Sequence, residues 1–184
     1  MYTTSSQTIG PYLHIGMDWA VNPDFVPDGV EGQRITVAGR IVDGDGAPVS
    51  DAMLEIWQAN AHGRYAHAAD ARDLPLDERF SGWGRVTTDE DGRFRFNTIK
   101  PGPVPSADGR AQAPHLNVTI FMRGMLKQLV TRMYFEGEAA NAHDPALADV
   151  PPSRRATLLA RPSGGVLAWN VVLQGEGETV FFAV

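Results

Sequence analysis

The amino-acid sequence predicts an all-β domain, built as a two-sheet β-sandwich with long loops. Helical periodicity is nearly absent from the 184 residues, whereas short alternating or apolar runs bounded by Gly, Pro and Asp recur along most of the chain. Two Asp/Gly clusters, at 43–46 and 89–92, are typical of tight hairpin turns. Several short strands joined in this way favour a sandwich.

The first four predicted strands are placed by these two turn signals. Arg34–Val42 ends at the first Asp/Gly cluster, and Ala52–Gln58 follows that cluster. Arg85–Thr88 and Arg93–Thr98 flank the second cluster. Each pair is therefore expected to form a hairpin or to lie in neighbouring positions.

Four further runs complete the predicted sandwich: His115–Arg123, Gln128–Phe135, Val166–Gln174 and Glu178–Phe182. At most one short helix is expected. It follows Pro151 and Pro152, where Ser153 is placed to cap a helical segment from Arg154 to Leu159.

Two irregular stretches stand outside the predicted strands. Residues 1–33 are rich in Gly and Pro without a sustained period, so they are expected to form an extended N-terminal arm that is free to wrap a partner. Residues 34–184 are then a single domain. The segment from Ala59 to Gly84 leaves about 25 residues without a predicted element, and loops of this length are usually functional.

Composition excludes several classes of function. The net charge is −6 and the sequence pI is about 5.3, which disfavours a phosphate-binding surface. No apolar run is long enough for a membrane span, and no secretory leader is visible. The chain has no cysteine, so disulfides and thiolate metal sites are excluded and a cytoplasmic location is expected.

Five segments carry a family resemblance: Leu54–Asn60, Gly63–Tyr65, Pro75–Asp77, Thr98–Pro105 and Ala113–Asn117. In these motifs, and from about Thr8 to the C-terminus, the sequence resembles the intradiol ring-cleaving dioxygenases. In that family the catalytic chain holds a non-heme Fe(III) with two tyrosines and two histidines. The tyrosines stand just before Pro-Leu-Asp and inside the Pro-Gly-Pro run, and the histidines form His-x-His on the next strand.

The four family ligand positions fall on Arg72, Val104, His115 and Asn117, which we call the vacated ligand positions. Valine has no lone pair, and the guanidinium of arginine is a permanent cation that only donates hydrogen bonds. Asparagine offers a neutral amide oxygen, which is a poor substitute for the anionic donors that Fe(III) prefers. His115 is therefore the one plausible ligand, and a lone histidine on a strand is usually a hydrogen-bonded structural residue.

The resemblance consequently implies a chain that keeps the dioxygenase scaffold without its metal. Some family members pair an iron-binding beta chain with a homologous alpha chain that binds none, and the closing segment Gln174–Phe182 looks like the alpha type. The implied complex, a hetero-oligomer, cleaves protocatechuate with O₂ to 3-carboxy-cis,cis-muconate, in the beta-ketoadipate pathway of aromatic catabolism. Fe(III) would belong to the beta chain, and this chain alone would be inactive.

The resemblance also implies residues that line a pocket shared with the beta chain. Thr8, Gly10, Pro11 and Tyr12 match a Thr-x-Gly-Pro-Tyr segment that helps to line the pocket, although a plain turn also fits the local sequence. Arg132 matches an arginine that reaches the pocket, where its planar fork suits the substrate carboxylate. The alternative for Arg132 is a surface ion pair with Glu136 or Glu138.

Two other interpretations stay open at the level of sequence. A rearranged iron site is possible if the register near Pro75 slips by one residue. Asp73 then joins His115, with His62, His67 or Tyr65 as further donors. The second alternative is a binding module without catalysis, because the 39–58 segment also looks like transthyretin-like or immunoglobulin-like sandwiches.

Overall fold

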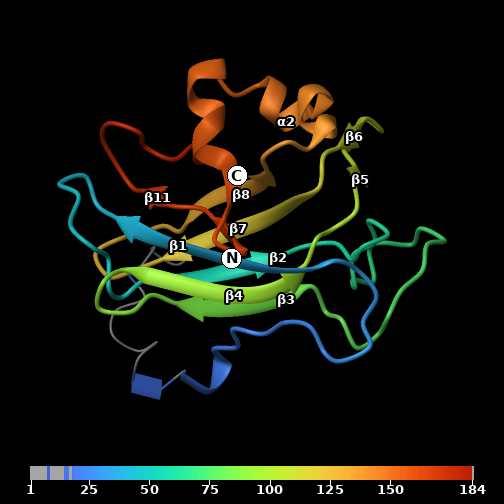
Figure 1. Ribbon diagram of the computed structural model, residues 1–184, viewed down its shortest axis with the longest axis horizontal. Helices are drawn as coiled ribbons and strands as arrows, with labels where there is room; N and C mark the ends of the chain where they lie inside the picture. The colour runs from blue at the N-terminus through green and yellow to red at the C-terminus, as the bar shows by residue number, and fades with distance from the viewer. Residues whose placement is uncertain (1–7, 9–14, 17, 184) are drawn as a thin grey trace, which may run out of the picture.

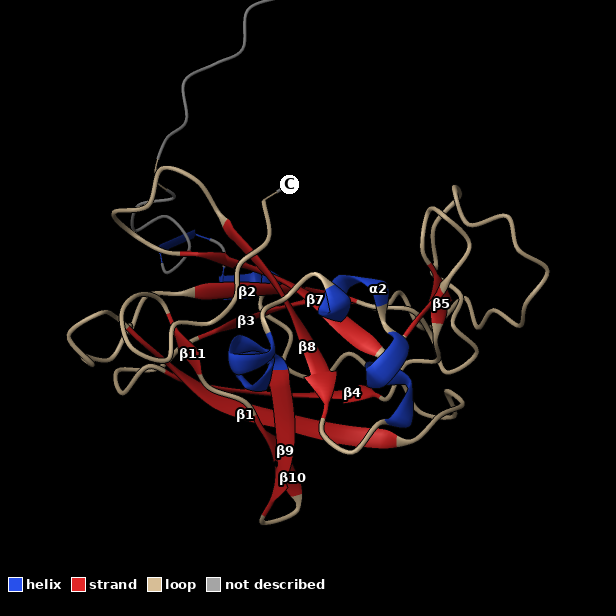
Figure 2. Ribbon diagram, turned by 90° about the horizontal axis from the view of Figure 1, so that it is seen from above, coloured by secondary structure: helices blue, strands red, loops and turns tan. Residues whose placement is uncertain are grey.

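The computed structural model describes residues 8, 15–16 and 18–183. Its elements are η1 (Asp18–Ala20), β1 (Arg34–Val42), β2 (Met53–Trp57), β3 (Trp83–Thr87), β4 (Arg93–Ile99), β5 (Val104–Pro105), β6 (Ala111–Gln112), β7 (His115–Phe121), β8 (Leu129–Phe135), η2 (Ala139–His143), α2 (Pro145–Ala148), η3 (Pro152–Leu158), β9 (Leu159–Ser163), β10 (Val166–Ala168) and β11 (Val171–Val172). The structure is mostly β, with few and short helices (Figures 1 and 2).

The expected two-sheet sandwich is wrong. The expected hairpins of 34–42 with 52–58 and of 85–88 with 93–98 are wrong too, because β1 pairs with β4, β10 and β11, and β2 pairs with β3 and β7. Within the described residues, nine strands form one strongly curved, nearly closed sheet in the order β11-β1-β10-β9-β8-β7-β2-β3, with β4 paired to β1, and β5 and β6 form a separate small hairpin. The reason is the β9–β10 hairpin. β9 pairs in parallel with β8 at Tyr134↔Leu159, and β10 pairs in parallel with β1 at Val37↔Leu167, so the hairpin joins the two would-be sheets into one.

Alternation of apolar and polar residues explains which face of each strand is buried. On β7, Leu116, Val118 and Ile120 are fully buried in the main core, while His115, Asn117 and Thr119 point to the opposite face. The apolar residues of β1, β2, β4 and β8 fill the same core. This pattern leaves the outer face of β7 and β8 available for polar chemistry.

The C-terminal third departs from the expected elements. The helix after Pro151 is a 3₁₀ helix, and Ser153 does not cap it: Pro151 is its N-cap residue, without a side-chain hydrogen bond. The stretch Val166–Gln174 is split into β10 and β11. Glu178–Phe182 is not a strand, because its recorded backbone bonds are scattered, for example from Phe182 N–H to the Val130 carbonyl at 2.8 Å.

Part of the predicted N-terminal arm contributes to the core. Phe25 is buried and stacks on Phe96 with ring centroids 5.2 Å apart. The backbone of Asn97 in β4 exchanges hydrogen bonds with Pro23 and Phe25, and Asn22 donates to Arg85 in β3. Residues 22–25 therefore bridge β3 and β4, the two strands at the ends of the curved sheet. The division into an arm (1–33) and a domain (34–184) stays a prediction.

Candidate functional site

The face of β7 and β8 that points away from the core brings together polar side chains from both strands. The antiparallel register pairs His115 with Tyr134 and Asn117 with Arg132. Directly paired residues lie on the same face of a sheet. Two of the vacated ligand positions therefore share their surface with a phenol and a guanidinium.

His115 is held as a neutral imidazole. Its side chain is buried, and Nδ1 lies 2.8 Å from the carbonyl oxygen of Ala113. A carbonyl only accepts hydrogen bonds, so Nδ1 carries the proton and Nε2 carries the lone pair. Burial, followed by the charge of Arg132, lowers the pKa of His115 to about 4.

Asn117 is bound to the aromatic wall of the site. Its Nδ2 donates to the carbonyl oxygen of Trp57 at 3.3 Å and to Oη of Tyr65 at 3.2 Å. Tyr65 stacks on Trp57 with centroids 5.5 Å apart and planes 10° from parallel. Burial raises the pKa of the Tyr65 phenol, so it stays protonated at neutral pH.

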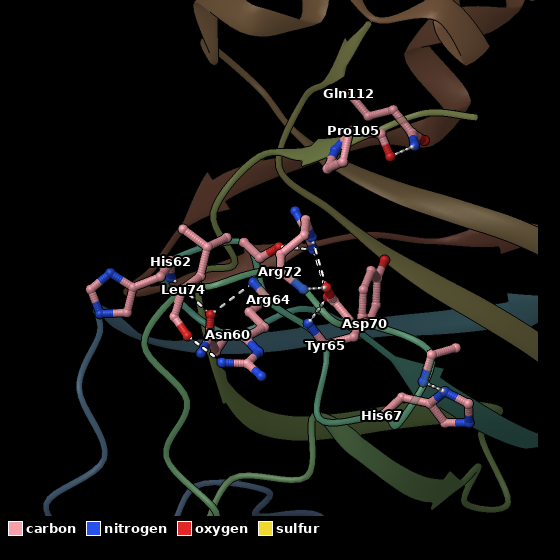
Figure 3. A network of polar contacts seen from close by, with 12 residues as sticks. Asn60, His62, Arg64, Tyr65, His67, Asp70, Arg72, Leu74, Pro105 and Gln112 are labelled. Carbon is pink, nitrogen blue, oxygen red and sulfur yellow. Dashed lines mark hydrogen bonds and ion pairs between the residues drawn. The ribbon is translucent and has the colours of Figure 1, made fainter. Parts of the chain in front are cut away.

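Arg72 is part of an ion pair that fastens the long loop. Its Nε and Nη2 donate to the two carboxylate oxygens of Asp70 at 2.7 and 2.6 Å, and Nη2 also donates to the carbonyl of Gly63 at 2.6 Å. Figure 3 shows this pair beside the ring of Tyr65. The same Asp70 accepts from the backbone N–H of Tyr65 at 2.8 Å. The Arg72 guanidinium holds the pKa of Asp70 far below its usual range.

The Pro-Gly-Pro run lies directly against this loop. A Cβ on Gly63, whose φ is +77°, would lie 2.0 Å from the carbonyl oxygen of Pro103. Glycine is therefore required at 63 both by its positive φ and by the close backbone approach. Val104 follows in β5 with its side chain buried, so this ligand position is filled by an apolar contact.

Two of the vacated ligand positions line one open hollow of about 650 Å³. Its lining includes Trp57, Tyr65, Asp70, Arg72, Val104 and Pro105. Asn117 is connected to this hollow through its hydrogen bond to Tyr65, and His115 lies on the same face of β7 as Asn117. An amide, a valine and a paired guanidinium do not fit a ferric ion.

The rearranged iron site is not assembled. Asp73 is exposed, His62 is exposed with Nε2 3.1 Å from Glu31, and His67 is exposed and accepts from the N–H of Ala69. In the part of the chain that the structure describes, no group of three or more His, Cys, Asp or Glu side chains is arranged to hold a metal ion.

Arg132 is half-buried, and its guanidinium forms hydrogen bonds with side chains of the same chain. Nη1 donates to Oε1 of Gln112 at 2.6 Å and to Oη of Tyr134 at 3.3 Å. The expected alternative, an ion pair with Glu136 or Glu138, is not formed, because Glu136 pairs with Arg161 and Glu138 with Lys100. Contact between Arg132 and a substrate carboxylate stays a prediction.

The predicted N-terminal pocket residues are only partly visible. The Thr8 hydroxyl accepts from the N–H of Gly124 at 3.0 Å and donates to the Met122 carbonyl at 3.4 Å, which places it beside the β7–β8 turn. Gly10, Pro11 and Tyr12 lie outside the described residues. Their role in a shared pocket stays a prediction.

Sequence reasoning missed three contributors to the site. Tyr134 could have been found, because it stands two residues after Arg132 and so shares its face of the strand. No sequence motif indicated Gln112 or Asp70, because their contacts depend on how the surrounding backbone folds. Gln112 Nε2, for example, donates to the Pro105 carbonyl at 3.1 Å and so closes the β5–β6 hairpin.

Comparison with known proteins identifies the family of the chain. The family model described as "Dioxygenase" matches residues 10–175. The chain is 42% identical to the protocatechuate 3,4-dioxygenase alpha chain of Pseudomonas putida over 97% of this chain and 95% of that one. It is also 42% identical to the protocatechuate 3,4-dioxygenase beta chain of Burkholderia cepacia, over 80% of this chain but 67% of that one.

Among solved structures, the dioxygenase domain of a dioxygenase–carbohydrate-binding fusion from Streptomyces sp. SirexAA-E matches with a TM-score of 0.62 and 26% identity. That match covers 97% of this chain and 100% of the other. The chain therefore belongs to the intradiol dioxygenase family. None of the helices in the described part of the chain combines the length and apolar character needed to cross a membrane.

Proposed function

We propose that this chain is the alpha subunit of a protocatechuate 3,4-dioxygenase, which binds no iron itself and pairs with a homologous beta subunit that holds Fe(III). The observation that carries the proposal is the set of side chains at the vacated ligand positions. Near full-length similarity to an alpha chain supports it. The assembled enzyme would cleave protocatechuate with O₂ between its hydroxyl-bearing carbons, giving 3-carboxy-cis,cis-muconate.

In such a complex the chain would act through burial and shape. It would cover an apolar face of the beta subunit, close one wall of the pocket with Thr8, Gly10, Pro11 and Tyr12, and keep water from the ring-cleavage steps. Arg132 would supply positive charge for the substrate carboxylate.

Metal analysis tests the division of labour between the chains. Produced without its partner, the chain should contain no stoichiometric iron, no visible tyrosinate-to-iron absorption and no dioxygenase activity; the co-produced complex should contain one iron per alpha–beta pair. Stoichiometric iron in the chain alone, with turnover, would contradict the proposal.

The carboxylate role of Arg132 is tested in the assembled enzyme. Arg132→Ala should raise the KM for protocatechuate at least tenfold, the loss of about 1.4 kcal/mol or more expected for one charge-assisted contact, while the KM for catechol, which lacks the carboxylate, changes little. Gln112→Ala is the matched control, because it removes the partner of Arg132 within the chain and keeps the charge. Equal changes for both substrates would discard the role.

A further inference from the structure

The imidazole of His115 is oriented as a metal ligand would be. Its Nδ1–H is bound to a backbone carbonyl, the partner that commonly orients ligating histidines, and its Nε2 lone pair has no hydrogen-bond partner among the described residues. The missing donors at the other three vacated ligand positions explain why affinity for a metal would be low. Nearby charges are a second factor, because they set the electrostatic potential at Nε2 of His115.

A fixed cation stands next to His115. Arg132 is paired with Asn117 across β7 and β8, one step along the same face from His115, and two contacts hold its Nη1, to Gln112 and Tyr134. After burial, its charge is the next largest cause that lowers the pKa of His115, and it partly opposes the rise that burial causes in the pKa of Tyr65. A guanidinium keeps this charge at every relevant pH.

Three of the four acidic groups nearest this face are paired with other cations. Glu136 and Glu138 are paired with Arg161 and Lys100. Asp70 is paired with Arg72. Asp144 lies behind Tyr134, where it accepts from the Tyr134 hydroxyl at 3.2 Å and from the backbone N–H groups of Ala113 and Leu147. Asp144 forms hydrogen bonds and no ion pair among the described residues, and it raises the pKa of His115 by less than Arg132 lowers it, so the charge of Arg132 outweighs that of Asp144 at the imidazole.

We propose that Arg132 excludes metal ions from the vacated ligand positions, so that the centre is closed by a fixed positive charge as well as by the loss of donors. A metal ion at His115 would stand beside a like charge that cannot be released as a proton. The inference deepens the proposed metal-free role of the chain, on which it rests, and it assigns that role to a residue outside the ligand set.

The test restores a second donor and then varies the charge. In the assembled complex, Asn117→His creates a His-x-His pair on one face of β7, and Cu²⁺ is the probe because imidazole binds it strongly. Affinity is measured by titration, with nitrogen ligation identified by the EPR spectrum of Cu²⁺. The complex with the unchanged chain supplies the background from other sites.

Asn117→His alone should bind Cu²⁺ weakly, and Asn117→His with Arg132→Leu should bind it at least tenfold more tightly. Two matched variants separate charge from structure. Arg132→Lys in the same background keeps the charge and should stay weak. Gln112→Ala releases the guanidinium from its partner without removing the charge, and it should also stay weak.

Equal affinities with Arg132 and with Leu at this position would overturn the proposal, and so would a gain from Gln112→Ala as large as that from Arg132→Leu. If Asn117→His lowers the yield of folded complex, Asn117→Asp, which keeps the side-chain shape, repeats the comparison. Stoichiometric iron in the unchanged chain would contradict the proposed function instead. Failure of the proposed function and failure of the Arg132 proposal are therefore distinguishable.

Discussion

The loop half and the strand half of the vacated ligand positions have changed in different ways. On the loop and hairpin, Arg72 and Val104 have become structural: one is paired with Asp70 and the Gly63 carbonyl, and the other is packed in the interior. On β7, His115 keeps the protonation and orientation of a ligand, while its neighbour Asn117 binds the Tyr65 phenol.

The difference shows that the vacated ligand positions on the loop and on the strand serve different structural purposes. A loop has no sheet to hold it, so the side chains that replaced ligands there had to supply the contacts that order it. A strand is positioned by its ladder, and His115 and Asn117 could change without loss of the fold. The loop should therefore be fragile to substitution and the strand face sensitive mainly to charge.

The largest expected effect comes from the backbone contact under the loop. Gly63→Ala combines a positive φ with a Cβ that would lie 2.0 Å from the Pro103 carbonyl, so it should lower the free energy of unfolding by about 3 kcal/mol. Gly124→Ala is the matched control, because Gly124 has a φ of +82° and open space around its Cβ; it should cost about 1 kcal/mol. Denaturant unfolding measures both, and similar losses would mean that the close approach does not matter.

The second effect is a pH dependence on the strand side. Because the pKa of His115 is lowered to about 4 in the folded state, the unfolded chain binds more protons than the folded one as the pH falls from about 6.5 towards 4. The stability that the neutral imidazole contributes should therefore be complete above pH 6.5 and should fall by up to about 3 kcal/mol as the pH drops across this window.

His115→Gln should remove this slope, whereas His67→Gln, at an exposed position, should leave it unchanged. The measurement is the free energy of unfolding between pH 7 and 4. An unaltered slope in His115→Gln would show that another group is responsible.

The smallest expected effect is the loss of the loop ion pair. Asp70→Asn leaves the Arg72 guanidinium without its anionic partner, and it should lower the free energy of unfolding by about 1.5 kcal/mol at pH 7. Because the pKa of Asp70 is lowered in the folded state, its ionised carboxylate stabilises the fold at pH values above its unfolded pKa of about 4. This stabilisation is lost as the pH falls below that value. The variant and the parent should therefore converge in acid.

Asp77→Asn is the control for this prediction, since Asp77 forms a similar pair with Arg79, whose side chain is 57% exposed against 32% for Arg72. It should change stability less than Asp70→Asn. Protease nicking between residues 66 and 74 is a second measurement, and it should rise only in the Asp70 variant.

Much of the local structure followed from the sequence. The predicted strand Arg34–Val42 is β1 with the same bounds, and those at 52–58, 93–98, 115–123 and 128–135 coincide with β2, β4, β7 and β8 to within a few residues. Alternation settles such strands, because one face must be buried. The assignment of the vacated ligand positions stays a prediction, while the inability of valine and arginine side chains to bind iron follows from their chemistry in any fold.

Sequence could not decide what depends on residues far apart in the chain. β9 carries Arg161 and Pro162 and shows no clear alternation, so the hairpin that joins the two halves of the sheet was missed, and a curved single sheet was taken for a sandwich. The partner of Arg132 was likewise hidden, because Gln112 stands in β6, 20 residues before Arg132 in the chain.

Sequence by itself therefore determined the family and most of the longer strands, which follow from motifs and short-range alternation, and the poor fit of Arg72, Val104 and Asn117 to iron, which follows from side-chain chemistry. Tertiary structure alone decided how the sheet closes and where each remaining charge lies. Distances between a fixed cation, an imidazole and the nearest carboxylates exist only after the backbone has brought those groups together.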